Sequence, residues 1–225
     1  DANRELTGLA QPDYGFDGWQ TALPVEALPF ETLSARMYPS LRVTETLEEP
    51  AVTELPGGGY VVDFGLNFAG TFTFTGELAA GQRVEFWPGE TLNADGTVSQ
   101  QSIGNGPVWD SYTAAGGGMS YTPKFVYHGF RYLEVRGLTE KPDASQFAGN
   151  IIHCDNGETG DFTTSDPVIN QIHTLITRSI SDNMYNVLTD CPHREKLGWM
   201  EVSQLLFNSI AANYDVAAWY ENYAG

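Results

Sequence analysis

Short stretches of alternating apolar and polar residues, separated by glycine and proline, fill the chain up to about residue 160. In residues 71–76, Phe72 and Phe74 alternate with threonines, so one face of the stretch is apolar and the other is polar. An Asp-Gly turn and a Gly-Gly-Gly loop punctuate this region. Such spacing predicts an antiparallel β-sandwich. The predicted strands include residues 60–65, 71–76, 83–89 and 125–137.

The pattern changes near residue 160 to a helical one. The tripeptide at 165–167, Ser-Asp-Pro, is typical of a helix start, with a capping residue followed by proline in the first turn. Apolar residues then recur at helical spacing and predict one amphipathic helix of about five turns. The apolar stripe consists of Val168, Ile169, Ile172, Leu175, Ile176, Ile180 and Met184.

A second helix is predicted from about residue 201 to residue 212, and residues 213–225 begin a further turn or helix. The predicted inner face of the second helix consists of Val202, Leu205, Leu206, Phe207 and Ile210. Two or three helices do not close a core of their own. We therefore expect either a small helical cap on the sandwich or, the interpretation we favour, the front portion of a larger helical domain.

The charge balance excludes some partners. The chain has 29 acidic and 11 basic residues, a net charge of −18. Such a surface repels phosphate backbones and anionic lipid, so nucleic acid and membranes are poor partners. No apolar run is long enough to span a bilayer, and the first residues lack a signal-peptide pattern. We expect a soluble protein, and the sequence leaves its compartment and oligomeric state open.

Residues 189–201, TDCPHREKLGWME, carry the densest set of reactive side chains. The metal-binding spacings CxxC and HExxH are missing from this segment. Cys191 and His193 lie only two residues apart, which does not give the geometry of a thiol nucleophile and its base. The other cysteine, Cys154, is remote and forms no CxxC pattern, so no disulfide framework is expected. We favour neither metal binding nor thiol chemistry.

The carboxylates of this segment suggest a different chemistry. Asp190, Glu195 and Glu201 accompany Arg194 and Trp199. An aromatic ring can cover the apolar face of a sugar while charged groups bond its hydroxyls. A carboxyl with a raised pKa can protonate a glycosidic oxygen. The spacing is equally compatible with a salt-bridged helix start in which Arg194 pairs outward.

Elsewhere the pattern predicts structural roles. Residues 127–132 read as a strand whose histidine and arginine, His128 and Arg131, point outward. His173 is expected to be a satisfied core or boundary histidine of the first helix. The remaining expectations are a strand end at His153 and Cys154 and core positions for Trp219, Tyr220 and Tyr223.

The residues TDCPHREKLGW resemble the signature loop of the α-L-rhamnosidases of glycoside hydrolase family 78. Four further stretches resemble family segments in the expected order, so the resemblance covers roughly residues 35–225. They are VVDFGLNFAGTF, FWPGETLNADG, PKFVYHGFRYLEVRG and GDFTTSDPVINQIH. The resemblance implies a mainly β fold, an antiparallel β-sandwich followed by the first helices of an (α/α)₆ barrel.

The same resemblance implies a division of the chain. Residues 1–35 would be the end of a preceding module and a linker, residues 36–155 the sandwich, and residues 156–225 the N-terminal part of a truncated (α/α)₆ catalytic domain. The family hydrolyses terminal non-reducing α-L-rhamnose residues with inversion, so a rhamnose-containing glycoside or glycan is the expected substrate. No cofactor is implied, and no dense Asp/Asn loop indicates calcium or another metal.

Carried over position by position, the resemblance places the general acid on Glu195. It assigns rhamnose hydroxyls to Asp190 and Arg194, and a wall of the sugar subsite to Trp199. Many members have an aspartate where this sequence has Val202. Either the preceding Glu201 takes over its contact or sugar recognition differs. The general base of the family lies far downstream, so we expect the 225-residue chain to be catalytically incomplete.

Two alternatives remain open. The first is a noncatalytic carbohydrate-binding sandwich whose helical tail only packs on it. The second is an (α/α)₆ glycosidase that acts on another sugar. Sugar binding without hydrolysis in the full-length protein would favour the first, and activity on a different glycoside would favour the second.

Overall fold

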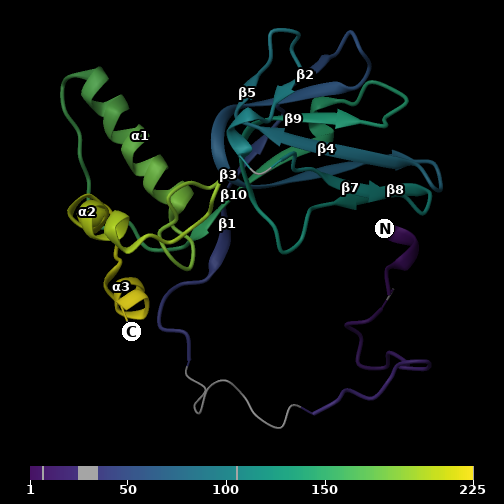
Figure 1. Ribbon diagram of the computed structural model, residues 1–225, viewed down its shortest axis with the longest axis horizontal. Coiled ribbons are helices and arrows are strands. Elements are labelled where there is room, and N and C mark those ends of the chain that lie inside the picture. The colour runs from purple at the N-terminus through teal and green to yellow at the C-terminus, as the bar shows by residue number, and fades with distance from the viewer. Residues whose placement is uncertain (7, 25–34, 105, 225) are drawn as a thin grey trace.

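A computed structural model describes residues 1–6, 8–24, 35–104 and 106–224. The prediction for residues 1–35 therefore lies partly outside the described residues, and the division of the chain into modules stays a prediction. In Figure 1 the strands and the three α-helices form two neighbouring parts of the molecule. The short 3₁₀ helix η1 (Ala2–Arg4) lies near the strand β7 (Asp110–Thr113).

Ten strands form in the described part of the chain. The strands before residue 100 are β1 (Leu41–Glu48), β2 (Ala51–Glu54), β3 (Tyr60–Leu78), β4 (Arg83–Gly89), β5 (Thr91–Leu92) and β6 (Val98–Ser99). The later strands are β7 (Asp110–Thr113), β8 (Gly117–Tyr121), β9 (His128–Arg136) and β10 (Phe147–Cys154). Two further 3₁₀ turns are η2 (Gln101–Ile103) and η3 (Ala144–Gln146).

The strand pairs are antiparallel, as the alternation predicts. Eight strands form one curled sheet whose main order is β1-β10-β3-β9-β4-β7, with β2 and β8 also paired to β3. The strands β5 and β6 form a separate two-stranded sheet. The helices α1 (Pro167–Asn183), α2 (Met200–Ala211) and α3 (Ala217–Ala224) follow. The predicted order of a mainly antiparallel β region followed by helices is confirmed.

The long strand β3 corrects one prediction. Residues 60–65 and 71–76 are expected as two strands, but both belong to the 19-residue β3. The residues between them keep pairing with β9, where Phe68 lies opposite Phe130. Gly65, with a φ of 75°, lies inside the register shift between Asp63 and Phe68. A glycine that looks like a strand end in the sequence is here part of a β-bulge.

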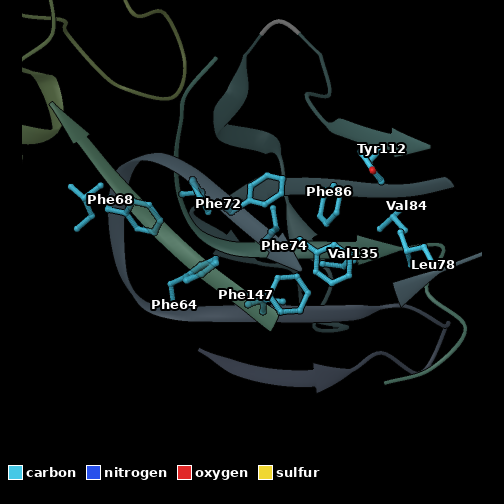
Figure 2. Packing of buried hydrophobic residues seen from close by; sticks show 14 of the residues in the cluster. Phe64, Phe68, Phe72, Phe74, Leu78, Val84, Phe86, Tyr112, Val135 and Phe147 are labelled. Carbon is cyan, nitrogen blue, oxygen red and sulfur yellow. The ribbon is translucent and has the colours of Figure 1, made fainter. Parts of the chain in front are cut away.

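The sheet curls around a cluster of aromatic side chains (Figure 2). The Phe72 ring lies 4.7 Å from the Phe86 ring, and the Phe74 ring lies 5.0 Å from the Phe147 ring, measured between centroids. Phe72 and Phe86 are completely buried. The alternation of Phe72 and Phe74 with threonines therefore places both rings on the inner face, as predicted.

The first helix begins where the sequence predicts. Asp166 caps α1, because its carboxylate accepts the N–H of Val168 at 2.8 Å. Only the end of the predicted apolar stripe is buried, at Ile180 and Met184. The exposed members of the stripe are Val168, Ile169, Ile172, Leu175 and Ile176.

In the second helix, too, only some residues of the predicted apolar face are buried. Ile210 is completely buried and Val202 is partly buried, whereas Leu205, Leu206 and Phe207 are exposed. The predicted inner face forms, but only one side of it meets other described residues. The prediction that Leu205, Leu206 and Phe207 are covered is not met by the described residues.

A second apolar core joins the helices to the sheet. Trp219 is completely buried, as predicted, and its indole N–H donates to the carbonyl of Tyr185 at 2.8 Å. Cys154 at the end of β10 packs in the same cluster, and its N–H donates to the carbonyl of Met184 at 2.8 Å. Nearby, the Ala69 N–H of β3 donates to the Asp182 carboxylate of α1 at 3.0 Å. The helical part is therefore fixed to the β1, β10 and β3 side of the sheet.

Among the described residues, no helix has the length and apolarity that crossing a lipid bilayer requires.

Candidate active site

The segment that connects α1 and α2, residues 184–199, carries most of the candidate residues. From Asp190 to Trp199 it forms turns and irregular structure, as expected from the sequence. Gly129 of β9 lies directly against it. A Cβ atom at that position would come within 2.9 Å of Pro192 and 3.0 Å of the His193 side chain. Only glycine permits this close approach, so residues 192 and 193 pack directly on the backbone of β9.

Asp190 organises the segment. Its Oδ1 atom accepts the N–H groups of Cys191 at 2.8 Å and Leu197 at 3.1 Å. Its Oδ2 atom accepts the indole N–H of Trp199 at 3.2 Å. The Asp190 N–H donates in turn to the Leu197 carbonyl at 2.9 Å. These bonds close the loop between residues 190 and 197 and leave part of Oδ2 open to a further donor.

Asp190 also contacts Glu195. Partial desolvation acts to raise the pKa of Asp190, but hydrogen bonds from the Leu197 N–H, the Glu195 side chain and Cys191 outweigh it. The net effect lowers the pKa of Asp190 below its ordinary value. Asp190 is therefore the ionised partner.

The remaining candidate residues, Trp199, Glu201 and Arg194, lie at different places around Asp190 and Glu195. The Trp199 side chain is 46% exposed and lies at the N-terminus of α2. Glu201 occupies the first turn of the same helix. The Arg194 side chain lies against Gly104, where a Cβ atom would come within 2.8 Å of its Nε atom.

The ion pair of the salt-bridged alternative is not found in the described part of the chain. No ion pair there joins Arg194 to Asp190, Glu195 or Glu201. One element of that alternative does occur, because a carboxylate in the first turn of α2 faces the positive end of the helix. The structure thus brings together Asp190, Glu195 and Trp199, and it keeps Arg194 unpaired with them.

Cys191 and His193 support the loop. The Cys191 sulfur accepts the N–H of Glu195 at 3.2 Å. His193 is buried, and burial lowers the pKa of its imidazole. Both Cys191 and Cys154 are free thiols.

The prediction that His128 points outward is wrong. His128 is only 4% exposed, and its Nε2 atom lies 2.8 Å from an Asp110 carboxylate oxygen. The first residues of β9 are covered on both faces because the 184–199 segment packs on Gly129. Arg131 is half-buried and forms a two-bonded ion pair with Asp63, at 2.8 and 2.9 Å.

Sequence reasoning also misses two residues next to the carboxyl pair. The Lys196 ammonium group donates to the Tyr127 carbonyl at 2.5 Å and lies 4.2 Å from the centre of the Tyr127 ring. The Tyr127 ring in turn stacks on Tyr185, 3.9 Å between centroids. Burial raises the pKa of Tyr127 to about 12, so its phenol stays neutral. No local sequence signal separates Lys196 from an ordinary exposed lysine.

Lys196 also lines a groove of about 750 Å³. Thr71, Thr73 and Asn150 from the outer face of the sheet line it, together with Tyr185 and Lys196. Asp190 and Glu195 do not line this groove. Asp190 is half-buried and Glu195 is exposed. We take these two carboxyl groups, and not the groove, as the candidate active site because carboxyl groups can transfer a proton.

Two family models match successive parts of the chain. The bacterial alpha-L-rhamnosidase concanavalin-like domain matches residues 53–153, which contain β3 to β9 and most of β10. The bacterial alpha-L-rhamnosidase 6 hairpin glycosidase domain matches residues 157–225. The chain belongs to the α-L-rhamnosidase family. The resemblance in the signature loop is thus confirmed by matches that extend over both parts of the fold.

Curated relatives agree with this assignment. An alpha-L-rhamnosidase of Formosa agariphila is 31% identical over 99% of this chain, and one of Streptomyces avermitilis is 33% identical over 88%. The aligned region is 24% of the first relative and 20% of the second. The chain thus spans about a quarter or less of the length of these α-L-rhamnosidases.

Solved α-L-rhamnosidase structures share the fold. The structure from Dictyoglumus thermophilum superposes with a TM-score of 0.93 at 31% identity, over 98% of this chain and 25% of that one. The Streptomyces avermitilis enzyme complexed with L-rhamnose gives 0.92 at 31% identity, over 99% of this chain and 22% of that one. The arrangement of sheet and helices described above is therefore that of α-L-rhamnosidases.

Proposed function

We propose that the complete protein carrying this chain hydrolyses terminal non-reducing α-L-rhamnosides with inversion, and that Glu195 is the general acid. The observation that carries the proposal is the loop of residues 190–197, which holds Glu195 close to Asp190. The Leu197 N–H donates to Asp190 Oδ1, and the Glu195 N–H donates to the Cys191 sulfur. Hydrogen bonds from the Leu197 N–H, the Glu195 side chain and Cys191 lower the pKa of Asp190, so Asp190 is a charged group beside Glu195. The names of the family's members supply the substrate class.

In the proposed reaction the carboxyl proton of Glu195 moves to the glycosidic oxygen. The bond between that oxygen and the anomeric carbon breaks, and the aglycone leaves as an alcohol. A water molecule attacks the opposite face of the anomeric carbon and gives its proton to a second carboxylate. Rhamnose is then released with inverted configuration. We assign the second carboxylate to no described residue of this chain.

The residues around the pair suit the sugar ring. The Trp199 indole, half exposed, offers an apolar face to the pyranose, while its N–H is already bound to Asp190. The Asp190 carboxylate can accept a sugar hydroxyl, and the Arg194 guanidinium, which forms no ion pair with a described residue, can donate to others. Glu201 is the proposed further hydroxyl contact. Val202, where many members have an aspartate, is half-buried and offers no polar atom.

We also propose the division of the chain that the resemblance implies. Residues 36–155 would form the sandwich, and residues 156–225 the first part of the (α/α)₆ catalytic domain. The exposed apolar faces of α1 and α2 support this division, because an (α/α)₆ barrel buries helices against further helices. The module assignment of residues 1–35 belongs to the same proposal.

The test is a substrate panel on the complete protein. We expect hydrolysis of phenyl α-L-rhamnoside, and no comparable rate with phenyl α-L-fucoside or phenyl β-D-glucoside. Proton NMR of the reaction shows which anomer of rhamnose appears first, and we expect the inverted β-anomer. Activity on another glycoside, with none on the rhamnoside, would overturn the substrate assignment. Binding of rhamnose without hydrolysis would instead support the noncatalytic module.

A further inference from the structure

The residue next to Glu195 has an unusual backbone. Lys196 adopts a φ of 59°, in the left-handed region. For a residue with a Cβ atom this conformation is unfavourable, so surrounding contacts must hold it. The flanking residues do so only in part: the Glu195 N–H is bound to Cys191, and the Leu197 N–H to Asp190. Both of these bonds are internal to the loop.

The Lys196 side chain is the connection from this loop to the rest of the molecule. Its ammonium group donates to the Tyr127 carbonyl and lies over the Tyr127 ring. Burial lowers the pKa of this ammonium group, with the charges of Asp110 and Cys191 opposing that effect. Removing a lysine from water in this way is unfavourable unless the contacts repay it.

The groups that contact Lys196 are themselves stacked and hydrogen-bonded. The Tyr127 ring stacks on Tyr185 with the planes only 17° apart, and Tyr185 is buried. The Tyr185 carbonyl accepts bonds from the Trp219 indole and from the Cys154 thiol, at 2.8 and 3.0 Å. The Lys196 ammonium group is therefore tied to the segment before β9 and, through two stacked rings, to the core that joins sheet and helices.

We propose that Lys196 is a positioning residue that holds the left-handed turn at residue 196 and thereby aims the carboxyl of Glu195. Its ammonium group lies on the sheet side of the loop, in the lining of the groove that Asp190 and Glu195 do not reach. It therefore acts through the backbone of Glu195 and does not touch the sugar. This inference rests on the proposed function of Glu195.

Leaving groups of different acidity separate positioning from general support. Protonation by a general acid matters for a poor leaving group such as phenol and matters little for 2,4-dinitrophenol. A misaimed acid therefore slows hydrolysis of phenyl α-L-rhamnoside selectively. A loop that merely unfolds slows both substrates equally.

The experiment measures kcat and KM of the complete protein on both substrates. For Lys196→Met, which keeps the apolar stem and removes the cation, we expect kcat on the phenyl substrate to fall about tenfold more than on the dinitrophenyl substrate. KM should stay within about twofold. Lys196→Arg keeps a cation over the ring but not the same bond to the carbonyl, so we expect a selective loss of about twofold to threefold. Lys141→Met, at an exposed lysine, is the control for loss of charge.

Melting temperatures show which variants are folded. If Lys196→Met does not fold, the Arg variant decides. An equal loss on both substrates, or no loss, in the folded variants would overturn the positioning role. A wild type inactive on both substrates would overturn the proposed function together with this inference. Selective loss in Glu195→Gln without selective loss in the Lys196 variants would overturn only the inference.

Discussion

The sheet and the helices of this chain bury their apolar side chains to very different extents. Phe72 and Phe86 in the sheet are completely buried, whereas Leu175 of α1 is 68% exposed and Leu205 of α2 is 75% exposed. Full burial of a side chain of this size stabilises the folded state by about 1.5–3 kcal/mol. The sheet thus has a closed core within the described residues, and the helices have only the small core around Trp219.

This difference bears on the proposed site. The candidate residues lie in a loop of the weakly buried helical part, but that loop packs on the well-buried sheet through Gly129 and Lys196. A catalytic group needs precise placement, which rigid neighbours supply. We therefore infer that contacts with the sheet hold the loop that carries Asp190 and Glu195 in place. Three variants test the contrast in burial between the sheet and the helices.

The largest effect is expected in the sheet core. Phe86→Ala removes a ring that contacts those of Phe72, Phe74 and Tyr121. The cavity left behind should lower the free energy of unfolding of this chain by about 3–5 kcal/mol. Urea denaturation followed by circular dichroism measures this, and Phe86→Leu should cost clearly less. A loss below about 1 kcal/mol in Phe86→Ala would show that the sheet core is not the main source of stability.

An intermediate effect is expected where α1 meets β3. Burial raises the pKa of Asp182 to about 6, although the Ala69 N–H and Arg178 oppose this effect. The protonated form is therefore favoured in the folded state. Stability from this group is fully present below the unfolded pKa, near 3.8, and is lost as the pH rises through about 6.

Asp182→Asn keeps an acceptor for the Ala69 N–H and removes the charge. We expect the variant to be more stable than the wild type at pH 7, by up to about 3 kcal/mol, with the advantage vanishing near pH 4. Thermal unfolding between pH 4 and pH 7 measures it, and Asp161→Asn at an exposed site is the control. A constant difference across this pH range would contradict the raised pKa.

The smallest effect is expected on the open helix face. Leu205→Ala removes an exposed side chain and keeps a good helix former, so stability of this chain should change by less than about 0.5 kcal/mol. The same urea experiment as for Phe86→Ala applies. A loss comparable to that of Phe86→Ala would mean that Leu205 is covered, and it would remove the contrast between the two parts.

Local patterns suffice to predict much of this fold. Phe72 and Phe74 face the core as their alternation indicates, and Asp166 caps α1 as its place before Pro167 indicates. The long strand β3 is missed because Gly65 reads as a strand end, although pairing with β9 continues past it. The exposure of Leu205 is missed because periodicity predicts which residues share a face but does not show what covers that face.

The candidate site is predictable only in part. The carboxylates Asp190 and Glu195 stand out by their density in the sequence, and the resemblance assigns their roles. The burial of His128 and the contact of Lys196 with Tyr127 depend on packing between segments more than sixty residues apart. No local pattern carries such information, and the residues that support the loop therefore emerge only from the structure.

The central claim, that Glu195 gives its proton to the leaving oxygen, is tested most directly by Glu195→Gln in the complete protein. The amide retains the shape and cannot act as an acid. We predict that kcat on phenyl α-L-rhamnoside falls by about 10²–10⁴-fold, while kcat on 2,4-dinitrophenyl α-L-rhamnoside falls far less. Losses of equal size on the two substrates, or an unchanged rate on the phenyl substrate, would contradict the claim.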